Sequence, residues 1–123
     1  MTLQELYELI DGDYGRAVQI MKIDKLISRY IQKFPKSGVN DALQEAGRSM
    51  DPVKLFESAH AMKGVCANMG LTKLADLVST LTEEYRPGNP RTLTDEQVKA
   101  AIAEIDALYS RTVEGIHQYE STL

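Results

Sequence analysis

Apolar residues recur along nearly the whole chain at alternating steps of three and four, which is the spacing of a helix with one buried face. The first segment carries Leu3, Leu6 and Ile10, and the breaker sequence DGD follows it. The next stripe consists of Ile20, Ile23, Ile27, Tyr30 and Phe34. We therefore expect a short helix at the amino terminus and one longer amphipathic helix, straight or kinked, over residues 20–34.

Residues 39–48 carry a thinner stripe, made of Val39, Leu43 and Ala46. So few apolar positions leave two interpretations open. The stretch is either another short helix that ends near Gly47 or only a connector.

The centre of the chain predicts a pair of antiparallel helices. Asp51 followed by Pro52 is a helix start, because Asp caps free amide groups and Pro fits the first helical position. The first stripe is Leu55, Ala59, Met62, Cys66 and Met69, and it ends at Gly70. The second stripe is Leu74, Leu77, Val78, Leu81 and Tyr85, and the sequence RPGNP closes it. The short break at Gly70 predicts a hairpin of the two helices.

A last, long helix is predicted after residue 94. Thr94 and Gln97 have the spacing of a capping box, and the stripe that follows is Val98, Ile102, Ile105, Tyr109, Thr112 and Ile116. Four main helices, each apolar on one side, can bury those sides together. We expect an all-α fold, an antiparallel up-down four-helix bundle with short additional N-terminal helices, in one domain over residues 1–123.

Composition narrows the class of protein. With 123 residues, of which 43% are hydrophobic, the chain has room for one core. Its single cysteine, Cys66, excludes an internal disulfide and a zinc–thiolate cluster. We expect a cytoplasmic protein, since no stretch reaches the length of a membrane span and no secretory signal stands at the start. Fourteen basic against eighteen acidic residues, with no dense basic run, argue against nucleic acid.

Candidate chemistry centres on His60. At about 100° per residue, this position lies at the edge of the predicted helix's buried face, about 120° or more from its apolar stripe. Such a side chain is supported by the bundle and open to solvent. Its neighbours on the helix surface are Phe56, Lys63, Gly64 and Ala67.

Gly64 and Lys63 are the neighbours that suggest a chemical role for His60. A glycine inside a helix costs roughly 0.5 to 1 kcal/mol relative to alanine, and access to the imidazole is a reason to accept that cost. Lys63 places a positive charge within reach of an anion at His60, and charge-assisted contacts to phosphate are among the stronger hydrogen bonds. The group favours a phosphoryl site.

The string AHAMKG from Ala59 to Gly64, followed by Asn68 and Gly70, resembles the signature of histidine-containing phosphotransfer domains. The leucines that follow Gly70 also match the second helix of that family's central hairpin. The resemblance implies that His60 is the phosphoacceptor, that Lys63 stabilises the phosphoryl group and that Gly64 keeps the face open. Many relatives carry serine where this chain has Cys66, another small residue.

The same resemblance implies a reaction and its partners. His60 would accept a phosphoryl group from the aspartate of a response-regulator receiver domain and pass it to another aspartate, with Nε2 as the modified nitrogen. The partners would be receiver domains and a hybrid sensor kinase. Mg²⁺ and an acidic pocket would belong to the receiver, so no cofactor is expected on this chain. We expect a monomer that docks briefly through a small patch around His60, consisting of Phe56, Glu57, Ala67 and Asn68.

Two other functions stay open. One is a helical adaptor that binds a receiver or another signalling protein without accepting phosphate. The other is an enzyme with His60 as general acid or base, although no second titrating group suggests itself. We expect His117 to be an exposed structural histidine and Cys66 to be a core thiol. Asn68 is either a docking or a helix-capping residue, and the pair Glu83 and Glu84 indicates a solvated helix face.

Overall fold

The computed structural model describes residues 1–123 and consists of helices joined by short turns. In chain order these are α1 (Leu3–Leu9), α2 (Tyr14–Met21), α3 (Asp24–Lys33), the 3₁₀ turn η1 (Phe34–Lys36), α4 (Val39–Ser49), α5 (Pro52–Asn68), α6 (Thr72–Tyr85) and α7 (Asp95–Glu120). The expected all-α class is confirmed. No helix combines the length and the apolar character that crossing a bilayer requires.

Helices α5 and α6 form the most extensive contact between any two elements. Asp51 begins α5 by accepting hydrogen bonds from the backbone N–H groups of Val53 and Lys54, with Pro52 in the first turn. The predicted stripe of α5 is buried throughout, and it consists of Leu55, Ala59, Met62, Cys66 and Met69. Gly70 makes the turn into α6 with a φ of +71°, a conformation that a side chain disfavours. The predicted hairpin is therefore present.

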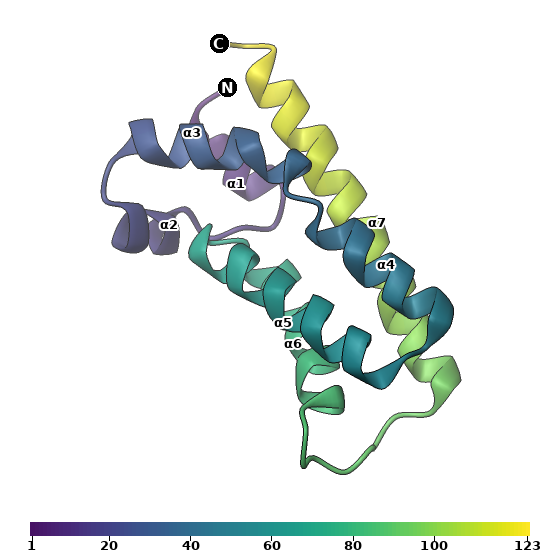
Figure 1. The fold of residues 1–123 in the computed structure, drawn as a ribbon. Helices are drawn as coiled ribbons and strands as arrows, with labels where there is room; N and C mark the ends of the chain where they lie inside the picture. Colours follow the sequence, from purple (N-terminus) through teal and green to yellow (C-terminus); the bar gives the residue numbers. More distant parts are fainter.

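Helix α4 occupies the stretch for which a connector was one interpretation. Its residues Leu43 and Ala46 are buried, and the helix packs against both α5 and α7. On the other side, α6 also packs against α5 and α7. Figure 1 shows α7 passing behind α4 and continuing beyond it to the C-terminus. The thin stripe of α4 is therefore enough to bury one side of the helix against these two neighbours.

The prediction of a single helix over residues 20–34 is wrong. Lys22 has a φ of 75°, so α2 ends at Met21 and α3 begins at Asp24. The turn changes the phase of the helix, and steps counted across it no longer share one face. Ile20, Ile23 and Tyr30, which the pattern assigned to the buried stripe, are exposed. The buried positions of α3 and η1 are Ile27, Ile31 and Phe34.

The N-terminal segment is attached to the turn between α5 and α6. The Tyr7 hydroxyl donates a hydrogen bond to the Met69 carbonyl at 2.7 Å, and the Asp13 N–H donates to the Gly70 carbonyl at 2.8 Å. A Cβ at Gly70 would lie 2.8 Å from the Asp13 carbonyl oxygen, closer than such atoms approach. This junction places α1 and α2 at one end of the hairpin and leaves the middle of α5 uncovered by them.

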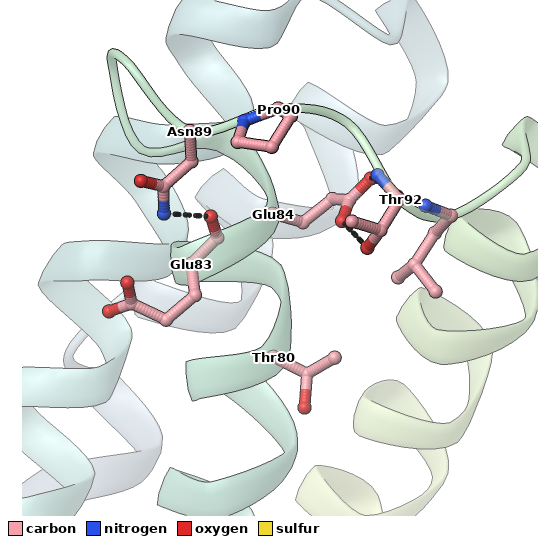
Figure 2. Close-up of a pocket in the computed structure, with 7 residues that line it drawn as sticks. Thr80, Glu83, Glu84, Asn89, Pro90 and Thr92 are labelled. Atoms are coloured by element: carbon pink, nitrogen blue, oxygen red, sulfur yellow. Dashed lines mark hydrogen bonds between the residues drawn. The ribbon is translucent and has the colours of Figure 1, made fainter.

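Glu84 corrects the expectation of a solvated pair at the end of α6. Its side chain is buried and accepts hydrogen bonds from the Arg91 guanidinium, the backbone N–H groups of Thr92 and Leu93, and the Thr92 hydroxyl. Figure 2 shows Glu84 directed at Thr92, whereas Glu83 points away from this loop. Burial raises the pKa of Glu84, but these hydrogen bonds outweigh it and lower the pKa to about 2. Glu84 thus holds the connection between α6 and α7.

Replacing the buried carboxylate by an amide, Glu84→Gln, is expected to lower the free energy of unfolding at pH 7 by about 1 to 3 kcal/mol, because charge-assisted hydrogen bonds are lost. The pKa of Glu84 in the fold is below its ordinary value of 4.5. Its stabilisation is therefore present above about pH 5 and decreases as the pH falls toward 2. Urea unfolding at pH 7 and pH 3 measures both effects.

The exposed, unpaired Glu104 of α7 provides the matched control, Glu104→Gln. Wild type and the control should lose more stability between pH 7 and pH 3 than Glu84→Gln does. An equal loss in all three proteins would contradict the role of Glu84.

Candidate functional site

His60 lies in the middle of α5 on its solvent side. The ring is exposed, and no side chain or backbone group of the chain forms a hydrogen bond with it. Its neighbours Ala59 and Met62 on the same helix are fully buried. The helix backbone is therefore fixed by its buried stripe, while the His60 side chain is exposed and both of its ring nitrogens lack a hydrogen-bond partner within the chain.

Phe56 orients the imidazole from one turn earlier in α5. The two rings are stacked, with centroids 5.4 Å apart and planes inclined by 13°. Phe56 is itself half-buried, and the guanidinium carbon of Arg86 lies 5.4 Å from the centroid of its ring. Residues four apart on a helix are neighbours, so the sequence spacing accounts for the stack. Arg86 comes from the far end of the hairpin, beyond α6.

Lys63 lies one turn after His60, and its side chain is half-buried against α6. Its Nζ is 4.0 Å from Glu83 Oε1. Glu83 also accepts two hydrogen bonds from Arg86, one from Nε at 3.0 Å and one from Nη2 at 2.9 Å. We name the five residues Phe56, His60, Lys63, Glu83 and Arg86 the His60 cluster. It contains two cations and one carboxylate around an exposed imidazole.

Gly64 leaves a gap beside the His60 cluster. A Cβ added at this position would meet no heavy atom within 4 Å. The glycine is therefore not required for packing, although it lies inside a helix where alanine is more stable. The absence of a packing reason is consistent with the expectation that Gly64 keeps the surface open.

The other predicted docking residues are also at the surface of α5. Glu57, Ala67 and Asn68 are exposed. Asn68 is the last residue of α5, and its side chain forms no hydrogen bond with the helix end, so the capping interpretation is not supported. These residues and the half-buried Phe56 leave a small surface of mixed character along one helix.

Sequence reasoning missed two members of the His60 cluster. Glu83 was assigned to a solvated face, and Arg86 was considered only as part of the sequence that ends α6. The hairpin itself contained the missing signal. Because α5 and α6 are antiparallel around the turn at Gly70, residues counted equal distances from the turn lie opposite one another, which places the end of α6 beside Phe56. The long side chain of Lys63 then brings its Nζ to 4.0 Å from Glu83 Oε1.

Two other candidate residues lie away from this chemistry. Cys66 is buried, and burial raises the pKa of its thiol to about 12, so it stays protonated at neutral pH as part of the core. His117 is exposed near the end of α7. In the chain as a whole, no three His, Cys, Asp or Glu side chains come together as a metal-binding group.

Comparison with known proteins gives one match. The model of a family described as Hpt domain matches residues 36–110, which is more than half of the chain and includes α4, α5, α6 and more than half of α7. Searches of curated proteins and of solved structures gave no significant match. Hpt domains are associated with phosphotransfer in two-component signalling and with binding to receiver domains. The chain belongs to the Hpt domain family.

Proposed function

We propose that this chain is a phosphorelay carrier that accepts a phosphoryl group on His60 from a receiver-domain aspartate and passes it to another aspartate. The observation that carries the proposal is the exposed imidazole of His60, with Lys63 on one side and the gap at Gly64 beside it. Membership of the Hpt family supports a phosphotransfer role. The assignment of that role to His60 is our inference from the geometry.

The proposed reaction is an in-line exchange between two carriers. A neutral imidazole with its proton on Nδ1 attacks through Nε2, whose lone pair is then free to act as the nucleophile. The N–P bond forms as the bond from phosphorus to the aspartyl oxygen breaks, and the electron pair leaves on the aspartate carboxylate. The ring, which is now an imidazolium, then loses its Nδ1 proton to water. Transfer to the next aspartate reverses these steps.

The chain's own contribution is positioning and charge. Phosphoryl transfer depends mainly on these two effects. Phe56 holds the imidazole by stacking, and Lys63 can reach the phosphoryl oxygens because its ammonium is not bound at hydrogen-bond distance. Gly64 admits the partner to the ring. Together with Glu57, Ala67 and Asn68, Phe56 would form the docking surface, which is small enough for brief complexes.

The wider setting follows the same proposal. Mg²⁺ and the acidic pocket would be supplied by the receiver domain, and a hybrid sensor kinase would be the source of phosphoryl groups. The chain would act as a cytoplasmic monomer with a single domain over residues 1–123. Its scaffold would be an antiparallel up-down bundle of α4, α5, α6 and α7, which is supported by the packing of each of these helices against two of the others.

Replacing the proposed acceptor, His60→Gln, is expected to abolish labelling by a receiver domain that carries ³²P-phosphoryl, because no other residue of the cluster offers a neutral nitrogen nucleophile. Labelled wild type should lose its phosphate in acid and keep it in base. The control His117→Gln removes the other histidine of the chain and should be labelled like wild type.

Circular dichroism should show unchanged helicity in both variants, since each histidine is exposed. Equal labelling of wild type and His60→Gln would refute the carrier function. Receiver binding without any labelling of wild type would favour the helical adaptor.

Two substitutions of Gly64 are expected to change the stability of the fold and the rate of phosphoryl transfer in opposite directions. Gly64→Ala is expected to raise the free energy of unfolding by about 0.5 to 1 kcal/mol, because the added methyl group has free space and alanine favours the helix. Gly64→Leu should remain folded but slow the transfer at least tenfold, since its side chain covers the approach to His60. Stopped-flow or quenched transfer assays with a labelled receiver measure the rate.

The control Ala61→Leu adds a similar volume at an exposed position about 100° from His60 around α5. Its transfer rate should stay within about twofold of wild type. A rate for Gly64→Leu equal to that of the control would remove the proposed reason for the glycine.

A further inference from the structure

Glu83 is shared by the two cations of the His60 cluster. Its Oε1 atom lies 2.9 Å from Arg86 Nη2 and 4.0 Å from Lys63 Nζ, and its Oε2 atom lies 3.0 Å from Arg86 Nε. The hydrogen bonds from Arg86, and to a smaller extent the charge of Lys63, lower the pKa of Glu83. At neutral pH the carboxylate is therefore charged and lies next to the cation that the proposed function assigns to the phosphoryl group.

The two cations are held differently. Arg86 donates two hydrogen bonds to Glu83 and is fixed by this paired geometry. Lys63 is beyond hydrogen-bond distance, its side chain is 36% exposed, and its stem is flexible. Lys63 can therefore leave Glu83 without leaving the carboxylate unpaired, because Arg86 continues to neutralise it. The movement of Lys63 toward an anion at His60 has a small cost.

A phosphoryl group on His60 would compete with Glu83 for the same ammonium. A phosphoryl group on a serine, threonine or tyrosine carries about −1.5 to −2 charges at pH 7, and the N-linked group on His60 would likewise be an anion. Like charges in one site disfavour each other. The carboxylate thus has two effects of the same sign. It holds Lys63 in the unphosphorylated protein, and it places negative charge next to the cation that the phosphorylated ring would require.

We propose that Glu83 weakens the hold of this carrier on its phosphoryl group by competing with that group for Lys63. The inference rests on the proposed function and adds a positioning residue to it. A carrier must give its phosphoryl group away as readily as it accepts it. A single carboxylate on the opposite helix of the hairpin would set that balance without touching the reacting atoms.

The central test is the equilibrium between a receiver domain and this chain. A receiver domain labelled from ³²P-acetyl phosphate and freed of donor is mixed with wild type or Glu83→Gln, and the label on each protein is measured at equilibrium. Exposed ion pairs are weak, so the variant should shift the ratio by about 1.4- to fivefold toward the phosphorylated carrier. An unchanged ratio overturns the inference.

Equilibrium is a sharper readout here than rate. A change in docking alters the forward and reverse transfers together and leaves the distribution between the free proteins unchanged. The control Asp76→Asn removes one negative charge from the same face of α6, about two turns from Glu83, at an exposed residue that forms no ion pair. The ratio for this control should equal that of wild type. A shift as large as in Glu83→Gln would show that net charge alone causes the effect, and the inference would be wrong.

A second comparison tests the competition itself. In a Lys63→Gln background, Glu83→Gln should shift the ratio less than it does in wild type, because there is no ammonium to release. An equal shift in both backgrounds would contradict competition for Lys63. Failure of wild type to accept any label contradicts the carrier function, whereas normal labelling with identical ratios contradicts only the role of Glu83.

A measurement on the unphosphorylated protein completes the test. The NMR resonance of the Lys63 ε-methylene group should move in Glu83→Gln and stay in place in Asp76→Asn, since Glu83 pairs with the ammonium at 4.0 Å and Asp76 forms no ion pair with it. No movement in Glu83→Gln would show that the carboxylate does not engage Lys63, and the inference would then be wrong.

Discussion

The burial of one face of α5 against α6 determines where the residues of its exposed face lie. Leu55, Ala59, Met62 and Cys66 are fully buried, and the burial of one large apolar side chain contributes about 1.5 to 3 kcal/mol. The exposed ion pairs near His60 contribute much less, because water screens them. The rotation of α5 about its axis is therefore set by the core, and the charged residues adopt positions that this rotation allows.

The consequence is an imidazole that is oriented but not enclosed. His60 is supported by the stack on Phe56 and lacks any hydrogen bond within the chain, while the gap at Gly64 leaves the surface beside it free. The cations come from two parts of the chain, Lys63 on α5 and Arg86 after α6, and Glu83 connects them. A phosphoryl carrier needs this intermediate arrangement, since a group held too firmly could not be passed on.

Much of the hairpin could be predicted from the sequence because its signals are local. Asp51 and Pro52 mark the start of α5, and the steps between Leu55 and Cys66 lie within one unbroken helix. Across residues 20–34 the same reasoning failed at Lys22, where a left-handed residue changes the phase without a glycine or proline to announce it. Helix periodicity is reliable only as long as the helix continues.

Contacts between residues distant in the sequence were the second feature that the hydrophobic pattern could not predict. Glu84 looked like its neighbour Glu83, but it is buried by a loop that begins at Arg86 and returns Arg91 and Thr92 to its carboxylate. Glu83 and Arg86 were likewise assigned no role, because their meaning depends on Phe56 and Lys63 of the other helix. A one-helix projection locates His60, Lys63 and Gly64, and the hairpin is needed to find the rest of the site.

The most direct measurement of the central claim is a through-bond ¹H–³¹P NMR correlation on the protein after it has been phosphorylated by a receiver domain. Phosphorus should couple to the ring protons of His60, with a pattern that identifies Nε2 as the modified nitrogen. Coupling to any other residue, or the absence of a phosphorus signal from the protein, would contradict the account.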